Sequence, residues 1–362
     1  MENQEPKPRI LFVDDESSVL SAIRRALYLK RDQWEMVFAE SGREALALLE
    51  KKRVDIVISD MRMPEMDGAR LLLEIRQHHP DTIRMVLSGQ ADREQVLRCV
   101  KLAHRYFTKP CAPDELAQSI DELIGWKQKV VSAKVKELAS CVSFVPSSIE
   151  SITALLEELE KSSPDIGVVR NLICHDVGMS VKLIQLVSSS FFGDRQVIYD
   201  PGKAATLLGM DLLKQLVLEA EIFAEGDAMG RRIANFGQQA VEMAYNAKEI
   251  AQIRHGDIEL QEQAFLGGLL TNVGKMIMIY YAPERYQEVL DQVSDQCINL
   301  VDAERQVFGL THTEVGGYIL SLWGLPEKVI EAVYYYKEPA KFDRTGFHPV
   351  TAVFLADTIG KL

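Results

Sequence analysis

Five short apolar runs, each followed by an amphipathic helical stretch, fill the first 125 residues of the chain. A continuous apolar run of strand length is typical of a strand buried on both faces, and an intervening helix allows the next strand to run parallel to it. The predicted strands are 10–13, 36–39, 55–58, 83–87 and 106–107, and the predicted helices are 17–30, 43–50, 71–75, 93–102 and 114–126. This alternation predicts an α/β domain with a five-stranded, doubly wound parallel sheet covered by helices on both faces.

The pattern changes after residue 145, where apolar residues recur at intervals of three and four. Ile149, Ile152, Leu155 and Leu159 would share one face of a helix, and similar spacing continues to the C-terminus. The segment 124–142 has no Pro or Gly after Gly125, so we expect it to continue the fifth helix of the first domain. The predicted organisation is therefore an α/β domain over 8–125, a helical linker over 126–142 and an all-α domain over 143–362.

Composition excludes several classes of protein. The chain has 47% apolar and 26% charged residues and a formal net charge of -12, of which -9 falls on residues 126–362. Such acidity disfavours binding to nucleic acid or to an anionic membrane surface. No apolar run approaches the ~20 residues of a membrane span, and the N-terminus does not resemble a signal peptide. The five cysteines are widely spaced, so we expect reduced thiols in a cytoplasmic protein.

Carboxylates follow two of the predicted strands. Asp14 and Asp15 end the first strand, and Asp60 ends the third. Because the carboxyl ends of parallel strands meet at one edge of a sheet, these groups would converge, and clustered carboxylates suit Mg²⁺. Ser88 and Lys109 end the fourth and fifth strands at the same edge. The set predicts a phosphoryl-transfer site, although a single strand-end Asp could equally cap the helix that follows it.

Residues 8–125 resemble a bacterial response-regulator receiver domain. The matching motifs are VDDE at 13–16, SDMRMP at 59–64, MDG at 66–68, LSG at 87–89 and YFTKP at 106–110. The resemblance implies that Asp60 is the phosphoacceptor and that Asp14, Asp15, Asp60 and the Arg62 backbone carbonyl hold Mg²⁺. It also implies that Ser88 and Lys109 contact the phosphoryl oxygens, with Pro110 at the family's cis-proline position.

Three further positions match places that modulate such domains. Tyr106 stands at the family's aromatic switch position, where the ring swings inward as Ser88 moves toward the phosphate; the alternative is a ring that only packs on an edge strand. Arg62 and Gln90, each two residues after Asp60 and Ser88, stand where the family tunes the lifetime of the phosphoryl group.

Residues 138–362 resemble the HDOD domain, an all-helical relative of the HD metal-dependent phosphohydrolases. The matching motifs are HDVGMS at 175–180, VSSSFFG at 187–193, AATLLG at 204–209, FLGGLLTNVGK at 265–275, HTEVG at 312–316 and LWGLP at 322–326. An HD hydrolase needs His and Asp side chains from several helices around its metal ions.

The positions of that metal site are largely replaced in this chain. Thr271 and Asn272 occupy the signature His-Asp doublet, and the other relict positions are Gln239, His312, Tyr336, Lys337 and Asp357. We expect no metal in the HDOD domain, with His312 bonding locally or to solvent and Asp357 facing a polar pocket. The dipeptide His175-Asp176 lies outside the signature context and is interpreted as a helix-end turn. Tyr334, Tyr335 and Tyr336 could stack nucleobases, but packing in the core is the preferred interpretation.

These features predict a non-enzymatic response regulator of a two-component phosphorelay. A sensor histidine kinase would phosphorylate Asp60, and the change would reach a non-catalytic HDOD domain that binds a downstream signalling protein. The alternatives are a degenerate phosphodiesterase and a nucleotide-sensing module, both in cyclic-dinucleotide signalling. A homodimer through the last receiver helix and the linker is a further hypothesis, based on an apolar stripe of Ile124, Val131, Val135, Leu138 and Val142.

Overall fold

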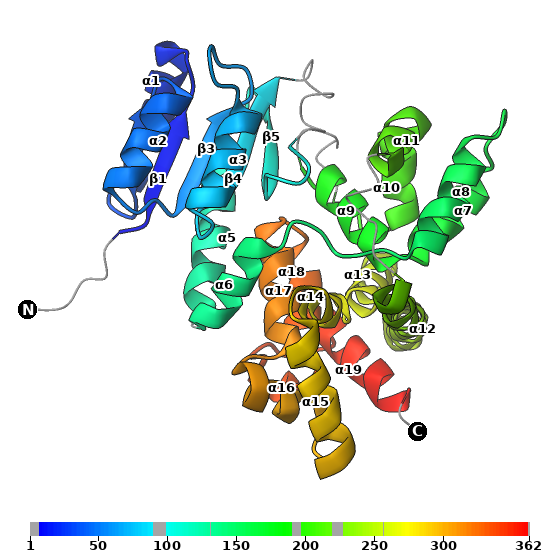
Figure 1. The fold of residues 1–362 in the computed structure, drawn as a ribbon. Coiled ribbons are helices and arrows are strands. Elements are labelled where there is room, and N and C mark those ends of the chain that lie inside the picture. The colour runs from blue at the N-terminus through cyan, green and yellow to red at the C-terminus, as the bar shows by residue number, and fades with distance from the viewer. Residues whose placement is uncertain are drawn as a thin grey trace, which may run out of the picture. The chain divides into compact units, whose positions relative to one another are not determined.

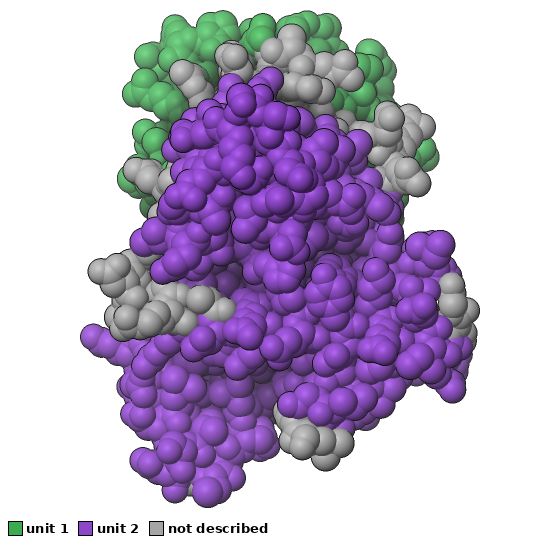
Figure 2. All heavy atoms as spheres, turned by 90° about the vertical axis from the view of Figure 1, so that its right-hand side faces the viewer, with its two compact units in different colours: residues 1–131, 189–191, 322–324 green, residues 132–188, 192–321, 325–362 purple. Residues whose placement is uncertain are grey.

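The computed structural model describes residues 7–89, 99–130, 132–189, 197–218, 227–255 and 257–360. The chain forms two compact units, one made mainly of residues 1–131 and the other mainly of residues 132–362 (Figure 2). None of the described helices is both long enough and apolar enough to span a membrane.

The first unit contains a five-stranded sheet with the order β2-β1-β3-β4-β5, and every pair of neighbouring strands is parallel. Helices α2 and α3 pack together on one face (Figure 1). A salt bridge of 2.6 Å between Lys30 and Asp121 joins η1 to α5. The elements are β1 Arg9–Val13, α1 Ser17–Ala26, η1 Tyr28–Lys30, β2 Glu35–Ala39, α2 Gly42–Lys51, β3 Ile56–Asp60, α3 Gly68–His78, β4 Ile83–Gly89, β5 Arg105–Lys109 and α5 Pro113–Lys129. This confirms the predicted α/β fold; most of the predicted helix 93–102 lies outside the described residues.

The predicted continuous linker helix is wrong. Helix α5 ends at Lys129 and α6 begins at Ala133, with Val130 and Ser132 both in extended conformations. Val130 is β-branched and Ser132 is the N-cap residue of α6, and both residue types have a lower propensity to continue a helix than Lys129 and Ala133 on either side. The apolar stripe proposed for dimerisation therefore does not share one helix, and its members Val135 and Val142 are buried within the chain.

The second unit is entirely helical in its described part. Its elements are α6 Ala133–Cys141, α7 Ile149–Leu159, α8 Ile166–Cys174, α9 Val177–Val187, α10 Pro201–Leu208, α11 Met210–Leu218, α12 Asp227–His255, α13 Ile258–Leu269, α14 Val273–Tyr281, α15 Pro283–Gln296, α16 Leu300–Phe308, α17 His312–Leu322, α18 Glu327–Tyr335, η4 Pro339–Lys341 and α19 Pro349–Ile359. Helices α12, α13, α18 and α19 pack on one another around small side chains such as Ala247, Ala264 and Ala352. Alanine side chains allow these helices to approach one another closely.

Helices α14 and α17 cross at Gly274, where a side chain has no room. A Cβ atom at this position would overlap the carbonyl group of His312 and lie 2.9 Å from the backbone nitrogen of Gly316. We expect Gly274→Ala to lower the free energy of unfolding by about 1–3 kcal/mol, because the overlap is with backbone that cannot rotate away. Chemical denaturation of the full chain would measure the change.

Gly237, within α12, provides the matched control. A Cβ atom there would meet only the His175 carbonyl oxygen, at 4.0 Å, so Gly237→Ala should be neutral or stabilise by up to about 1 kcal/mol. Equal stability of the two variants would show that α14 and α17 do not cross as closely as the structure places them.

Candidate functional site

The aspartates of the first unit meet at one edge of the sheet because β1 and β3 are neighbours. Val13 lies opposite Ser59 in the register, so Asp14 and Asp60 follow side by side, and their residues are only 2% and 7% exposed. The ammonium of Lys109, at the end of β5, donates to Asp14 Oδ2 at 2.6 Å and also forms an ion pair with Asp60 Oδ1. The predicted cluster is thus assembled, with a lysine between two of its carboxylates.

The backbone holds the same carboxylates in place. The Arg62 N–H donates to Asp60 Oδ2 at 2.6 Å, and the Glu16 N–H donates to Asp14 Oδ1 at 3.0 Å. The Lys109-Pro110 peptide bond is cis, as the motif implied. Asp15 is exposed and lines a groove of about 430 Å³ together with Met63, Pro64 and Asp67.

Burial changes the pKa values of the charged groups at this site. Burial raises the pKa of Asp60, and the nearby charge of Asp14 adds to this effect, although Lys109 and the Arg62 N–H oppose it. Burial alone would lower the pKa of Lys109, but its bonds to Asp14 and Asp60 raise it overall. The two buried carboxylates therefore require a cation between them, and Lys109 supplies it.

The donor chemistry of this edge fits Mg²⁺. Asp14, Asp15 and Asp60 offer hard carboxylate oxygens, and like charges gathered at one place favour a divalent cation. Among the described residues, no three His, Cys, Asp or Glu side chains are grouped closely enough to hold an ion as they stand. This agrees with Lys109 lying between Asp14 and Asp60.

The predicted switch residues lie near this edge. Ser88 is fully buried and pairs in register with Thr108, the residue before Lys109. The ring of Tyr106 points inward and is 1% exposed, with its hydroxyl donating to the carbonyl oxygens of Cys99 and Ala103 at 3.0 and 3.2 Å. Arg62 is exposed, and Gln90 lies outside the described residues.

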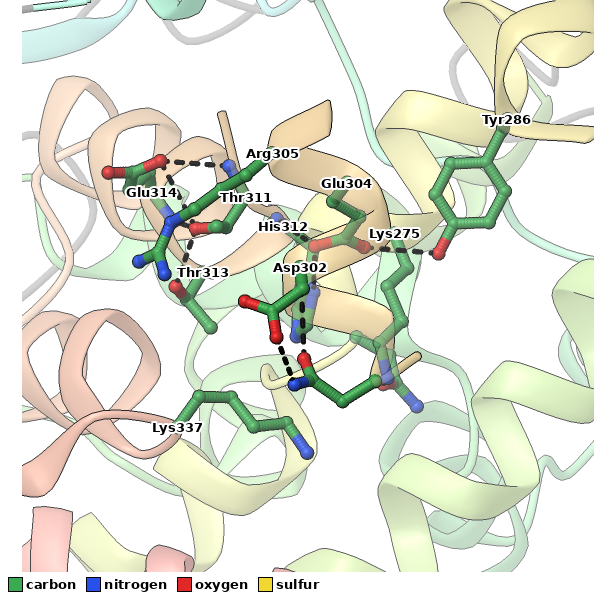
Figure 3. Close-up of polar contacts among 12 residues, drawn as sticks. Lys275, Tyr286, Asp302, Glu304, Arg305, Thr311, His312, Thr313, Glu314 and Lys337 are labelled. Atoms are coloured by element: carbon green, nitrogen blue, oxygen red, sulfur yellow. Dashed lines mark hydrogen bonds and ion pairs between the residues drawn. The ribbon is translucent and has the colours of Figure 1, made fainter. Parts of the chain in front are cut away.

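The second unit has a buried polar cluster centred on His312 (Figure 3). His312, the first residue of α17, is fully buried, and its Nδ1 lies 2.7 Å from Glu304 Oε2 of α16. Its Nε2 lies 2.8 Å from the Tyr336 hydroxyl, and Glu304 Oε1 accepts from Tyr286 at 3.3 Å. The expectation that His312 bonds locally or to solvent is wrong, because helix packing encloses it completely and its partners are Glu304 of α16 and Tyr336.

Sequence reasoning missed Glu304. A signal is present in the sequence, because Leu300, Glu304 and Phe308 recur at intervals of four and place a carboxylate on the apolar stripe of α16. The buried carboxylate is compensated by the imidazole, by the Tyr286 hydroxyl and by the His312 backbone N–H, which donates at 2.9 Å. Burial would raise the pKa of Glu304, but His312 and the charge of Lys275 lower it overall.

Lysines lie at or beside the relict metal positions. Lys275 donates to Asn272 Oδ1 at 2.9 Å, and Lys337 donates to both carboxylate oxygens of Asp357 at 2.7 Å. Thr271 donates to the Gly268 carbonyl oxygen at 2.7 Å. Gln239 is exposed on α12. This set does not fit a divalent cation, because its oxygen donors are neutral or already paired with ammonium groups.

Two features of the HDOD sequence also have alternative interpretations, the dipeptide His175-Asp176 and the three tyrosines at 334–336. Asp176 caps the N-terminus of α9 by accepting from the Met179 N–H at 2.9 Å, while His175 is exposed, so the two side chains do not converge. The Tyr336 ring is buried in the core, which leaves only Tyr334 and Tyr335 partly exposed.

The cluster predicts a pH dependence of stability. Burial lowers the pKa of His312 despite the nearby Glu304, whereas the unfolded chain has an ordinary histidine pKa of about 6.5. Below about pH 6.5 the unfolded state therefore binds a proton that the native state does not, and stability falls as the pH falls. The charge of Glu304 adds a further loss below about pH 4.5, since its pKa is also lowered in the folded state.

Thermal unfolding between about pH 8 and about pH 5 would measure this dependence. His312→Gln should flatten the curve in this pH range, because it removes the buried imidazole. A curve that is equally steep in His312→Gln would show that another group causes the loss.

Comparison with known proteins identifies both units. The family model of the HDOD domain matches residues 145–339, and that of the response regulator receiver domain matches residues 10–121. The hydrogenase transcriptional regulatory protein HoxA of Cupriavidus necator is 33% identical over 117 residues, covering 32% of this chain and 24% of HoxA. The regulatory protein AtoC of Escherichia coli is 40% identical over 111 residues, covering 30% of this chain and 23% of AtoC. The chain thus spans about a quarter of the length of these relatives.

Two solved structures are similar to parts of this chain. A receiver domain of an HD domain-containing protein from Pseudomonas fluorescens is 33% identical, covering 31% of this chain and 90% of that one, with a TM-score of 0.30. The MmoQ response regulator of Methylococcus capsulatus is 22% identical, covering 60% of this chain and 87% of that one, with a TM-score of 0.49. The match of the HDOD model to more than half of the chain decides the assignment. The chain belongs to the HDOD domain family, and within it this protein is a response regulator whose receiver domain precedes the HDOD domain.

Proposed function

We propose that this response regulator accepts a phosphoryl group on Asp60 from a sensor histidine kinase, and that its HDOD domain binds another signalling protein without catalysing a reaction. The observation that carries the first part is the ammonium of Lys109 between the buried carboxylates of Asp14 and Asp60. Such a site already balances clustered negative charge, which is the requirement for receiving a phosphoryl group.

The proposed transfer needs few protein groups. A carboxylate oxygen of Asp60 attacks the phosphorus of a phosphohistidine, the phosphorus–nitrogen bond breaks, and an acyl phosphate forms while the imidazole leaves. Lys109 offsets the charge of the incoming phosphoryl oxygens, and the Arg62 N–H keeps the Asp60 carboxylate oriented. Asp14, Asp15, Asp60 and the Arg62 carbonyl would hold Mg²⁺, which when bound offsets the remaining charge.

The proposed signal leaves the site along β4 and β5. Ser88 lies beside Thr108 in the register, and the same pair of strands carries Tyr106. The Tyr106 hydroxyl donates to the carbonyl oxygens of Cys99 and Ala103, so a movement of the ring would break both hydrogen bonds and release residues 99–103. We propose that phosphorylation shifts the population from the arrangement with these hydrogen bonds to the arrangement without them.

The proposal of a non-catalytic HDOD domain is supported by its charges. Hydrolysis at an HD site needs a metal-activated water, and Lys275 and Lys337 place ammonium groups at and beside the metal positions. The acidic balance of residues 126–362 disfavours nucleic acid as the bound partner.

The decisive experiment is affinity capture from native lysate with protein treated with Mg²⁺ and beryllofluoride, compared with Asp60→Asn given the same treatment. A protein enriched in one of the two states supports a phosphorylation-gated adaptor. Captures that are identical in both states contradict the gating, and captures that hold no specific protein contradict the partner-binding role.

A further inference from the structure

A buried arginine of the receiver domain takes part in neither the Asp60 site nor the proposed switch. Arg84, the second residue of β4, is 2% exposed, and burial lowers the pKa of its guanidinium to about 10. Among the described residues no carboxylate forms a salt bridge with it, and its acceptors are mainly backbone carbonyl oxygens. A buried charge without an opposite charge depends on such dipoles for its compensation.

The guanidinium joins two parts of the chain that are distant in sequence. Its Nε donates to the Leu102 carbonyl oxygen at 2.7 Å. Its Nη1 donates to the carbonyl oxygens of Thr82 and Pro80, just before β4, at 3.0 and 3.3 Å. One side chain therefore ties residues 99–103 to the start of β4.

Residues 99–103 also contact the site and the switch. The Tyr106 hydroxyl donates to two carbonyl oxygens of this segment. The Cys99 thiol donates to the Met61 sulfur at 3.5 Å, and Met61 directly follows Asp60 in the chain. A displacement beside the phosphoacceptor can thus reach this segment through a direct side-chain contact.

The bond from Arg84 to Leu102 is the one that a movement of residues 99–103 would break. Leu102 lies between the two residues whose carbonyl oxygens Tyr106 holds, whereas the other two acceptors of the guanidinium precede β4. If the segment moves, the guanidinium loses one of these three carbonyl acceptors while its charge remains buried. Arg84 therefore stabilises the arrangement in which the Tyr106 hydroxyl is bonded to the segment.

We propose that Arg84 is a positioning residue that holds residues 99–103 in the unphosphorylated arrangement and thereby opposes their release when Asp60 is phosphorylated. The inference rests on the proposed switch at Tyr106 and names the residue that sets its equilibrium. Ligand binding and a conformational equilibrium are coupled in both directions. A weaker hold on the segment must therefore strengthen the binding of a phosphoryl analogue at Asp60.

The test compares the unchanged full chain with Arg84→Met, which keeps much of the side-chain volume but removes the charge and all of its donors. Beryllofluoride, an analogue of the phosphoryl group, is titrated calorimetrically at a fixed Mg²⁺ concentration. We expect the variant to bind it about tenfold more tightly, because the released arrangement is more populated before the analogue binds. A purely structural role would destabilise the domain without tightening this binding, so equal or weaker binding would overturn the proposal.

Hydrogen exchange gives a second readout that needs no phosphoryl analogue. The amides of residues 99–104 should exchange about tenfold faster in untreated Arg84→Met than in the unchanged protein. Arg9→Met is the matched control, because the Arg9 guanidinium donates to Glu35 and to the Arg53 carbonyl oxygen, both at 2.6 Å, at the start of β1. It should alter neither the affinity for beryllofluoride nor the exchange of residues 99–104. Equal exchange in Arg84→Met and the unchanged protein would contradict the hold on the segment.

The unchanged protein decides the matter if Arg84→Met fails to fold. The Nε–H signal of Arg84 in a ¹⁵N NMR spectrum reports the bond to Leu102, and it should shift when Mg²⁺ and beryllofluoride are added. A signal that stays in place while beryllofluoride binds contradicts the role of Arg84 alone. An unchanged protein that does not bind beryllofluoride contradicts phosphoryl uptake at Asp60 itself, so the two failures give separate results.

Discussion

Asp60→Asn is expected to abolish phosphoryl uptake by the chain. Asparagine is nearly the same size as aspartate, but its amide is not nucleophilic enough to form an acyl phosphate. Intact-mass measurement after incubation with acetyl phosphate and Mg²⁺ should show one added phosphoryl group in the unchanged protein and none in the variant. The expected loss in yield is at least about a hundredfold, because the amide that replaces the carboxylate cannot form an acyl phosphate.

Two controls separate this loss from misfolding. Burial and the charge of Asp14 raise the pKa of Asp60, so the ionised side chain is disfavoured in the folded state, and Asp60→Asn should unfold at the same temperature or a higher one. Asp81→Asn, at an exposed aspartate whose nearest cationic partner is Arg53 at 3.9 Å, should take up phosphate normally. Uptake that persists in Asp60→Asn would place the phosphoacceptor elsewhere.

Glu304→Ala should have the largest effect on the stability of the HDOD domain. The substitution leaves the buried His312 N–H groups and the Tyr286 hydroxyl without their acceptor, and it opens a cavity between α16 and α17. Each buried donor left without an acceptor typically costs about 1–3 kcal/mol, and the new cavity adds to this loss. Chemical denaturation of the full chain, monitored by a spectroscopic signal of its helices, would measure the loss of unfolding free energy.

Glu304→Gln tests whether the His312 imidazole is neutral or charged beside Glu304. Burial lowers the pKa of His312, so we expect a neutral imidazole at pH 7 whose Nδ1–H donates to the carboxylate while Nε2 accepts from Tyr336. A glutamine oxygen can accept the same hydrogen bond, so the variant should lose only about 1–2 kcal/mol. A loss as large as that of Glu304→Ala would show instead that His312 is charged in the folded protein.

The parts of the fold that could be predicted from sequence were those governed by local pattern. The strand that ends at Asp60 is a continuous apolar run, and its neighbour ends at Asp14, so the parallel topology was enough to bring the two carboxylates together. The break after Lys129 was not predicted, because no Pro or Gly marks it and valine and serine disfavour a helix only weakly.

The HDOD interior shows the limit of such reasoning more clearly. His312 could be identified as a relict position, but its partner Glu304 is on another helix, and only packing shows that both are fully enclosed. The hydrogen bond that Asn272, at the start of α14, donates to the Phe236 carbonyl oxygen of α12 at 3.0 Å is likewise invisible in sequence. In both cases the hydrogen-bond partner lies on another helix, so the spacing of residues within one helix does not reveal it.

The lysines of the HDOD interior have a consequence for how this domain depends on its surroundings. A metal ion in a protein is exchangeable, so its occupancy varies with supply, and chelators can remove it. The ammonium groups of Lys275 and Lys337 are covalent parts of the chain, and they accompany the fold through every condition that keeps the chain intact. The bonds of Lys275 to Asn272 and of Lys337 to Asp357 are therefore independent of the supply of metal ions, whereas the His312 cluster responds to the pH of the medium.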